Sequence, residues 1–545
     1  MNYFREDRPF QEMLRFLKWK ARPDLEALGS FVGTELLEAA DWIDRGSRPF
    51  LQTWGVRGHR LDWVRISPEH RRVLQRLREL GAMSIEEDAN FPLQSHFLGG
   101  YVISDAGLFC SVTLTAQTAW ALYKYGDEGL KGRHLPSLLD RSGTGAWGAT
   151  FYTEIQGGSD LGANETVARR VGDSWRLWGS GKSFASNAGL ADLVLVTAKP
   201  DPPRPGPRGI ALFLVPSTTG SGEANFRIRR LRDKTGTRAV PTGEVELDGS
   251  EGFLLGRAEE GLFIALEVLN IARVDNALAS IGLARKALWE ASRYAAHRRA
   301  FGKTLREHPL LLRDLAEMEA EVEVGLLLAL QAARAVSQTA RDRPPYSPEY
   351  FQARIWTHVA KALTAWMAQE VTRKCLEILG GLGFLEEFPL ARLHREALVT
   401  SIWEGTSNIQ ALELLDLLRR PAVREGFLDE LDRRVADLPS EGSLRNSVKE
   451  ESHREREWLK RQDLSSPRME FFAKDLLTRM GHLLSTIFFA EWTGEANAPP
   501  SRRALLNLYG VRSRFSDVPD IAEESLREAL DWMSAPPKDS GGPHL

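Results

Sequence analysis

The hydrophobic periodicity of this chain changes twice along its length. Apolar residues recur at helical spacing up to about residue 145, which predicts a helical segment over residues 1–145. Short β-like runs follow over residues 146–255, and helical periodicity then returns over residues 256–420. A further segment, residues 421–545, is also mostly helical in pattern. The chain is therefore expected to be α+β, mostly α, with four domains at these boundaries.

The middle segment contains seven short runs that are rich in β-forming residues and separated by Gly, Asp, Pro and Ser. They are Gly148–Tyr152, Thr166–Arg170, Ser174–Trp178, Leu193–Ala198, Ile210–Val215, Phe226–Leu231 and Gly243–Leu247. Strands of this length and spacing predict a small β-barrel or sandwich.

The third segment contains few helix breakers. Pro309 is placed to open a helix, and Arg341–Pro345 marks a turn. About four helices of about 20 to 30 residues fit between such breaks, and long helices with short links predict an antiparallel four-helix bundle.

The last segment contains two apolar helical stretches, Met469–Trp492 and Ile521–Met533, with a linker at Ala496–Pro500 between them. Gly541–Pro543 is expected to be disordered. Ten apolar residues of the first stretch recur at three- and four-residue spacing, so one broad face should be buried. They are Phe471, Phe472, Leu476, Leu477, Met480, Leu483, Leu484, Ile487, Phe488 and Phe489.

Composition narrows the class of protein. A hydrophobic content of 43% and a charged content of 27% over 545 residues are typical of a globular protein. A net charge of −3 offers no general attraction to nucleic acid. Cys110 and Cys375 suit neither a disulfide framework nor a metal site, which favours a reducing cytoplasm. Neither a signal peptide nor a membrane span is expected from the hydropathy pattern.

One acid lies in an unusual setting, the segment Trp403–Asn408. Glu404 stands between a bulky indole and Gly405, and this glycine lets the backbone approach a ligand closely. Ser407 or Asn408 could cap the helix that follows. The segment could simply be a capped loop with an exposed acid. Alternatively, an acid that is desolvated beside Trp403 has a raised pKa and can serve as a base.

Two further segments could bind a cofactor. In Phe151–Asp160 the glycines free backbone N–H groups, and Thr153 and Ser159 add short hydroxyls, as the edge of a heteroaromatic ring or a phosphate requires. By itself this segment is also typical of a turn. In Lys182–Asn187, Phe184 could cover a ring, or it could be a buried side chain at the end of a strand.

Taken together, these segments resemble the acyl-CoA dehydrogenase family over roughly residues 60–420. Three details resemble its AidB-type branch: Trp403 before the acid, Gly157–Asp160 upstream, and the C-terminal extension. The resemblance implies a helical N-terminal domain, a small β domain and a four-helix bundle, followed here by an additional helical domain.

The resemblance also implies FAD as cofactor and Glu404 as the base that removes the α-proton of an acyl-CoA. The implied FAD-binding residues are Tyr152, Thr153, Gly158, Ser159, Phe184, Ala185, Ser186, Arg298, Phe301, Glu377, Gly381, Trp403, Thr406 and Asn408. The implied substrate-binding residues are Ser159, Arg273 and Gly405. No metal is implied.

Some positions depart from the family pattern. Ile155 replaces a proline, and Ala300 replaces a threonine, which puts one hydrogen bond in doubt. Glu377 replaces a glutamine and could repel the cofactor phosphates unless Arg298 compensates. The family also has members whose base lies on the helix around Arg273, where Asp275 and Glu267 would be the candidates.

The resemblance implies partners as well. In similar proteins the segment with Arg298 and Phe301 reaches the FAD of a neighbouring subunit, so a homo-oligomer is expected, a dimer of dimers in form. An electron-transfer flavoprotein is the expected electron acceptor. An acyl-CoA oxidase, whose reduced flavin reacts with oxygen, is an alternative.

A DNA-associated flavoprotein is the other alternative, because AidB-type proteins are linked to alkylation stress. Phosphate binding needs a basic surface. Residues 421–545 carry 18 Lys and Arg against 22 Asp and Glu, and their basic run alternates with acids. That run has Arg454, Arg456, Lys460 and Arg461 among Glu450, Glu451, Glu455 and Glu457. A second basic cluster, Arg227, Arg229, Arg230, Arg232, Lys234 and Arg238, is interpreted as a solvated strand face. The enzyme is therefore favoured.

Overall fold

The computed structural model describes residues 1–19, 22–85, 92–172, 174–438, 443–494, 500–514 and 523–534. The chain divides into two compact units. The barrel unit holds residues 34–100 and 105–275, and the bundle unit holds residues 1–33, 101–104 and 276–545. Most of the expected linker at 496–500 and the expected disordered end at 541–543 lie outside the described residues.

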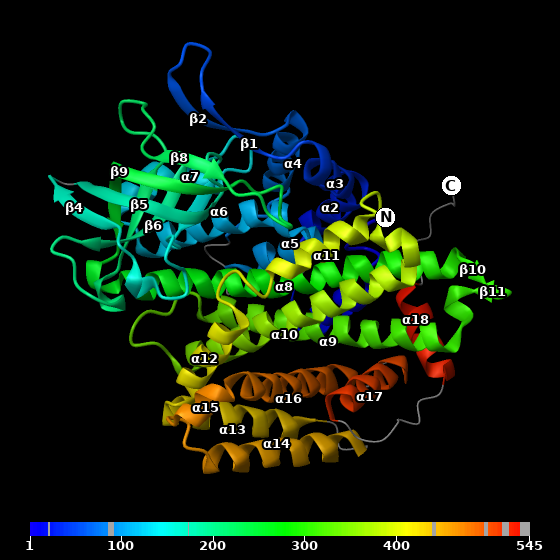
Figure 1. Ribbon diagram of the computed structural model, residues 1–545. Helices are drawn as coiled ribbons and strands as arrows, with labels where there is room; N and C mark the ends of the chain where they lie inside the picture. Colours follow the sequence, from blue (N-terminus) through cyan, green and yellow to red (C-terminus); the bar gives the residue numbers. More distant parts are fainter. Residues whose placement is uncertain are drawn as a thin grey trace. The chain divides into compact units, whose positions relative to one another are not determined.

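Seven strands of the barrel unit form one sheet within residues 148–255, which are described except for residue 173 (Figure 1). They are β3 (Gly148–Phe151), β4 (Val167–Val171), β5 (Ser174–Ser186), β6 (Leu193–Pro200), β7 (Ala211–Pro216), β8 (Arg227–Leu231) and β9 (Thr242–Leu255). The order is β3-β6-β4-β5-β9-β7, with β8 paired to β9 off this path. Because β6 also pairs with β7, the sheet closes into a small barrel. All seven predicted runs are confirmed, although β5 and β9 extend well beyond them.

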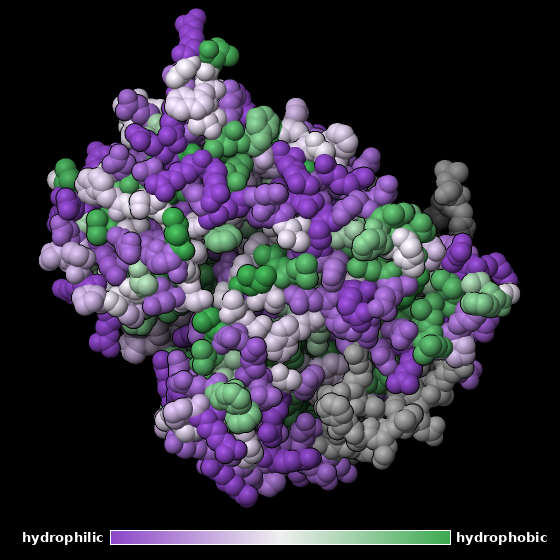
Figure 2. Space-filling model, in the orientation of Figure 1, coloured by the Kyte–Doolittle hydropathy of each residue, from purple (hydrophilic) through white to green (hydrophobic). Residues whose placement is uncertain are grey.

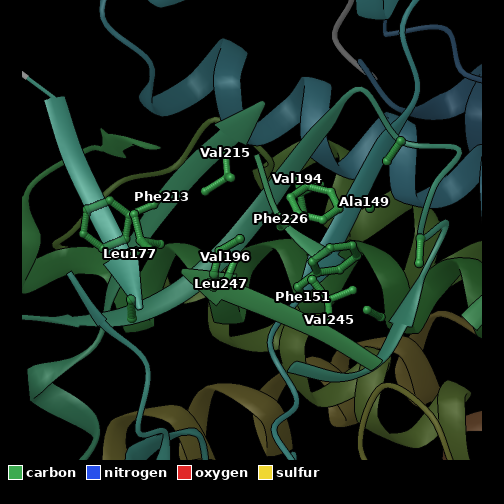
Figure 3. Close-up of a cluster of buried hydrophobic side chains, with 14 of the residues drawn as sticks. Ala149, Phe151, Leu177, Val194, Val196, Phe213, Val215, Phe226, Val245 and Leu247 are labelled. Carbon is green, nitrogen blue, oxygen red and sulfur yellow. The ribbon is translucent and has the colours of Figure 1, made fainter. Parts of the chain in front are cut away.

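The barrel interior is filled by apolar side chains from alternating positions of these strands. Figure 3 shows Phe151, Val196, Phe213 and Val245 gathered in one cluster, and all four are fully buried or nearly so. Outside the barrel, the long helix α6 (Ala106–Tyr125) packs on β3 and β6. Asp105 is the N-cap of this helix and accepts a 2.9 Å hydrogen bond from the Leu108 N–H.

The rest of the barrel unit is mainly helical. Its further helices are α3 (Leu37–Gly46), α4 (Pro68–Glu79), α5 (Gln94–Ile103, whose last residues belong to the bundle unit) and α7 (Glu128–Leu139). A hairpin of β1 (Phe50–Trp54) and β2 (Arg60–Arg65) interrupts the segment that was expected to be helical. Its side chains are half-buried or exposed, so no clear alternation of apolar and polar residues marks it in the sequence.

The bundle unit is built around long helices. Within the fully described stretch 261–418 these are α8 (Gly261–His297), α9 (Pro309–Thr339) and α10 (Pro348–Leu379), followed by the shorter α11 (Pro389–Val399) and α12 (Ser407–Leu418). The boundary between the two units falls inside α8, after Asp275. About four helices of about 20 to 30 residues were expected. Three helices are longer, with 37, 31 and 32 residues, and the loop that contains Glu404 separates the two shorter ones. Pro309 opens α9 as predicted.

Two strands and the terminal helices complete the bundle unit. β10 (Arg299–Ala300) and β11 (Lys303–Thr304) form a hairpin between α8 and α9. The N-terminal helices are α1 (Arg8–Phe16) and α2 (Pro23–Phe31). The C-terminal helices are α13 (Pro421–Asp437), α14 (Ser443–Arg461), α15 (Pro467–Phe471), α16 (Ala473–Thr493), α17 (Pro500–Arg514) and α18 (Glu523–Ser534). Among the described residues, no helix is long and apolar enough to cross a membrane.

The C-terminal helices pack on the bundle through α16. This helix contacts α9, α10 and α12 on one side and α13 and α14 on another (Figure 1), and the Phe488 ring lies edge-on to Trp356 at 5.2 Å. The buried face is confirmed except at its start. The helix breaks at Phe472, so that Phe471 and Phe472 are 82% and 40% exposed. The outer surface over α13 and α14 is mostly hydrophilic (Figure 2).

Candidate functional site

Glu404 lies in the loop between α11 and α12 in a strained backbone conformation. Its φ is +57° and that of Gly405 is +91°, both in the left-handed region. For a residue other than glycine this conformation costs about 1–3 kcal/mol, so it persists only where the surroundings fix it. The side chain of Glu404 is half-buried. The following helix has Thr406 as its N-cap, which corrects the expectation of Ser407 or Asn408.

Three buried polar side chains fix the backbone around Glu404. The Gln410 amide donates to the carbonyl oxygens of Glu404 and Gly405, at 3.1 and 2.9 Å. Lys361 Nζ donates to the Gly405 carbonyl at 2.7 Å. His358 Nδ1 lies 2.9 Å from Gln410 Oε1 and orients that amide. Because all three side chains have no exposed surface, these bonds are protected from water and hold the loop firmly.

The residues before Glu404 are tied to α8. The indole N–H of Trp403 donates to Asn276 Oδ1, and the Asn276 amide donates to the Thr400 carbonyl at 3.0 Å. On the other side of the loop, the Trp366 indole N–H donates to Ser407 Oγ at 3.0 Å. The loop is therefore held at its start, centre and end, while Thr406 and Asn408 are exposed.

In the barrel unit, the segment after β3 forms a tight glycine turn. The backbone N–H groups of Glu154 and Gly157 donate to each other's carbonyl oxygens at 3.2 and 3.0 Å. A Cβ on Gly158 would lie 2.4 Å from Thr153 Oγ1, so glycine is required there for the Thr153 hydroxyl to keep its place. Tyr152 is buried, Thr153 and Gly158 are half-buried, and Ser159 is exposed. The turn therefore presents hydroxyls and backbone at the surface of the barrel.

An ion pair lies beneath this turn. Lys182 Nζ is 2.9 Å from Glu154 Oε1, and both side chains are buried. Glu154 also accepts bonds from the N–H groups of Glu165 and Thr166 and from the Thr166 hydroxyl, at 2.6, 3.2 and 2.6 Å. Burial opposes ionisation, but the Lys182 charge and these donors outweigh it and lower the pKa of Glu154 to about 2. Glu154 is thus a permanent anion that shapes the turn.

Phe184 interrupts the strand β5 with a φ of +55°. Its ring is 61% exposed, so the alternative of a buried phenylalanine at a strand end was wrong. Its neighbour Ala185 is buried, and Ser186 Oγ lies 3.2 Å from Thr242 Oγ1. The Arg232 guanidinium lies 5.4 Å from the centre of the Phe184 ring. An exposed ring held in a strained backbone is suited to stack on a planar ligand.

The other candidate bases on α8 are committed to buried pairs. Asp275 accepts from His96 Nε2 at 3.0 Å and from the Thr113 hydroxyl. Burial opposes protonation of His96, but the Asp275 charge outweighs it and raises the pKa of His96. Glu267 lies 2.6 Å from both Lys124 Nζ and the Tyr125 hydroxyl. Arg273 is also buried in this half of α8.

The hairpin β10–β11 presents Phe301 at its tip. Phe301 and Gly302 both have positive φ, as a two-residue hairpin loop requires, and Phe301 is 97% exposed. Arg298 is exposed at the base of the hairpin. Glu377 is exposed near the end of α10 and forms an ion pair with Arg373 of the same helix. Gly381, four residues on, is exposed as well.

The sequence-derived site residues thus fall in both units. The barrel unit contains Tyr152, Thr153, Gly158, Ser159, Phe184, Ala185, Ser186 and Arg273, and the bundle unit contains Arg298, Phe301, Glu377, Gly381, Trp403, Glu404, Gly405, Thr406 and Asn408. Sequence reasoning missed the residues that support them. Lys361 had a usable signal, because a single lysine within an apolar run is seldom buried without a polar partner. Lys182 had no such signal, because it lies between Gly181 and Ser183.

Three parts of the chain match models of known protein families. Residues 1–142 match the AidB N-terminal domain, residues 149–250 the acyl-CoA dehydrogenase middle domain, and residues 259–416 its C-terminal domain. AidB of Escherichia coli K12 is 32% identical over 423 residues, which are 74% of this chain and 76% of that protein.

Two solved structures have a similar fold. Bd2924 in its apo form has a TM-score of 0.82 at 28% identity, covering 90% of this chain and 98% of that one. ACDH-11 of Caenorhabditis elegans, crystallised with C11-CoA, has a TM-score of 0.84 at 24% identity, covering 97% and 94%. The chain therefore belongs to the acyl-CoA dehydrogenase family of FAD-dependent oxidoreductases, in its AidB-type branch.

Proposed function

We propose that this protein catalyses the α,β-dehydrogenation of an acyl-CoA thioester, with Glu404 as the base that removes the α-proton. The observation that carries this assignment is the fixed, strained backbone at Glu404, whose carbonyl is bonded to Gln410. Strain that the surroundings maintain is typical of catalytic residues. Asp275 and Glu267, the other candidates, are already engaged in buried pairs.

The residues of the barrel unit fit FAD, the cofactor of the family. FAD, when bound, supplies the acceptor for the substrate's β-hydride. Thr153 and Ser186 offer hydroxyls to the polar edge of the flavin, and Phe184 offers an exposed ring to its face. Gly158 leaves the space that the Thr153 hydroxyl needs. We assign Tyr152, Ser159 and Ala185 to the same surface, and Trp403, Thr406 and Asn408 to the cofactor side of the Glu404 loop.

The backbone N–H of Glu404 is assigned to the thioester carbonyl. A fixed N–H stabilises the negative charge that develops on this oxygen as the α-proton leaves. Gly405 follows Glu404 and leaves room for the thioester, and Arg273 and Ser159 are assigned to substrate binding. The bonds from Gln410 and Lys361 keep the loop in the conformation that this role requires.

The exposed aromatic residues of the bundle unit support assembly of several copies. Phe301 is 97% and Phe384 93% exposed, and Figure 2 shows hydrophobic side chains around the β10–β11 hairpin. A contiguous exposed apolar patch is typical of an interaction surface. We propose a homo-oligomer, a dimer of dimers, in which Arg298, Phe301, Glu377 and Gly381 contact the FAD of a neighbouring subunit. An electron-transfer flavoprotein is the proposed electron acceptor.

The C-terminal helices give little support to the alternative of a DNA-associated protein, because basic side chains there are paired with acids. Arg456 on α14 bonds Asp429 and Asp432 on α13 at 3.0 and 2.7 Å, and Arg479 bonds Glu455 at 2.6 Å. Basic side chains that are paired with acids release few counterions on binding a phosphate backbone. This pattern favours the enzyme.

The test is anaerobic bleaching of the purified yellow protein with a panel of acyl-CoAs. We expect Glu404→Gln to keep FAD and thioester binding while flavin reduction slows by at least about 100-fold, because general base catalysis contributes about 10²–10⁴-fold. Glu386→Gln is the matched control, since Glu386 is an exposed acid that pairs with Arg395. Bleaching of the Glu404 variant at nearly the wild-type rate would contradict the assignment. Rapid reoxidation in air would instead identify an oxidase.

A further inference from the structure

A cavity of about 420 Å³ lies in the barrel unit, between the start of β1 and the segment from β8 to the start of β9. Six cationic side chains line it: Arg48, Arg229, Arg230, Arg232, Lys234 and Arg238. Five of them lie in one segment, residues 229–238, and the fold adds Arg48 from just before β1. The arginines of β8 are exposed, as expected for a solvated strand face, and two of them, Arg229 and Arg230, also line the cavity.

The carboxylates around the cavity do not balance these cations. Glu244 accepts from both Arg230, at 2.8 Å, and Arg232, so one acid serves two arginines. The hydrogen bond from Arg230, together with the charges of the neighbouring arginines, lowers the pKa of Glu244, which keeps it ionised.

Three looser pairs complete the balance. Arg229 lies 3.3 Å from Glu246, Arg238 lies 3.4 Å from Asp44, and Arg48 lies 3.8 Å from the exposed Asp233. Among the residues that the structure describes, four carboxylates therefore pair with five of the six cations, which leaves a formal excess of two positive charges. An excess of two suits a dianion.

Lys234 has a different role from the arginines. Its Nζ donates to the carbonyls of Thr237 and Val240, at 2.6 and 2.8 Å, and to the Thr242 hydroxyl at 3.0 Å. These bonds fix the Lys234 ammonium at the wall of the cavity. Its side chain is therefore already ordered before a ligand binds. The arginines supply planar, multidentate donors, which match phosphate oxygens.

The cavity also has an apolar side. Phe50 is 60% exposed, and Leu51, Val240 and Pro241 line the cavity beside it. A bare inorganic anion would leave this surface unused, whereas an organic phosphate could place its ring on Phe50 and its phosphate among the arginines. The volume is within the range of small-molecule sites, about 300–1,000 Å³.

We propose that this cavity binds a nucleoside monophosphate, with the phosphate held by Arg48 and Arg229 and the base packed against Phe50. None of the residues that line the cavity is assigned to FAD, to the thioester or to the base, although Arg232 lies 5.4 Å from the Phe184 ring and Thr242 Oγ1 lies 3.2 Å from Ser186 Oγ. If AMP does not bind here, the proposed dehydrogenase activity is unaffected. If the dehydrogenase proposal fails, AMP binding to this cavity can still be tested.

The experiment is calorimetric titration of the full-length, FAD-loaded protein with AMP, adenosine and inorganic phosphate at low ionic strength. We expect AMP to bind and adenosine to bind at least about tenfold more weakly, because charge-assisted bonds to the phosphate are lost. Arg48→Gln combined with Arg229→Gln should weaken AMP by about tenfold or more. Phe50→Ala should weaken AMP but leave inorganic phosphate binding unchanged.

The matched control is Arg227→Gln. Arg227 is an exposed arginine on the same strand, β8, but it does not line the cavity, so this variant should bind AMP as the wild type does. Equal AMP affinity in the double variant and the wild type would overturn the proposal, as would the absence of AMP binding at about 1 mM. Release of FAD in step with AMP binding would also overturn it, because AMP would then occupy the cofactor site. If single-stranded oligonucleotides displace AMP and bind far more tightly than AMP does, the ligand of the cavity is a nucleic acid and the proposal of a nucleoside monophosphate is wrong.

Discussion

Lys182 Nζ lies 2.9 Å from Glu154 Oε1, and both side chains are buried under the glycine turn of the barrel. Lys182 also donates to the carbonyls of Thr197 and Tyr152, at 2.8 and 3.4 Å. Burial lowers the pKa of Lys182 to about 8, although the Glu154 charge opposes this shift. One ion pair thus connects β5 and β6 with the residues that flank Thr153.

Replacing Lys182 with methionine should therefore destabilise the barrel and loosen the turn. Lys182→Met leaves Glu154 buried without its cation, which typically costs about 3–5 kcal/mol. The free energy of unfolding, measured by denaturant titration, and the retention of FAD on dialysis should both fall. Lys131→Met, at an exposed pair with Glu128, is the control and should change stability by less than about 1 kcal/mol. Unchanged stability in Lys182→Met would show that the pair does not contribute.

The exposed Arg298 should matter for assembly and for cofactor retention together. If it contacts the FAD of a neighbouring subunit, Arg298→Ala removes a charge-assisted pair with the cofactor phosphates. Light scattering should then show a shift towards smaller species, and gel-filtered protein should contain less FAD. Arg313→Ala, an exposed arginine on α9, should change neither. A wild-type protein that is monomeric with FAD bound would refute the prediction.

Helices α16 and α10 pack closely at Gly481. A Cβ there would lie 2.6 Å from Leu363 Cδ1, in a helix whose inner face is buried. Gly481→Ala should destabilise the protein by about 1–3 kcal/mol, because the core is overpacked. Gly426→Ala is a control of identical chemistry, since its Cβ would meet nothing within 4 Å in α13, and it should be neutral or slightly stabilising. Equal effects in thermal unfolding would contradict the packing.

Stability should fall between pH 6.5 and 4 because of His70. Burial lowers the pKa of this fully buried histidine to about 4, although the Asp105 charge opposes the shift, and the unfolded chain has a pKa of about 6.5. In this window the unfolded state binds more protons, so acidification costs up to about 3 kcal/mol. The wild type should lose stability more steeply than His70→Leu in urea titrations at several pH values. His59→Gln, at an exposed histidine, should follow the wild type.

The sequence by itself determined the class of fold and the place of the acid. Periodicity of 3.6 and of 2 residues predicted the helices and all seven barrel strands, because burial of one face imposes these patterns locally. Glu404 stood out in the sequence because it lies between Trp403 and Gly405 in a segment that resembles the family's catalytic motif. The left-handed backbone of Glu404 itself is visible only in the structure.

Only the tertiary structure determined which residues that are far apart in the sequence contact each other. Lys182 meets Glu154, Asn276 meets Trp403, and Lys361 meets the Gly405 carbonyl across separations that no local pattern records. The same limit explains the exposure of Phe471 and Phe472. Their spacing is that of a buried face, but the helix breaks at Phe472 and turns both rings outward. Periodicity states which residues can share a face, and the tertiary contacts decide which of them are covered, because burial depends on what packs against them.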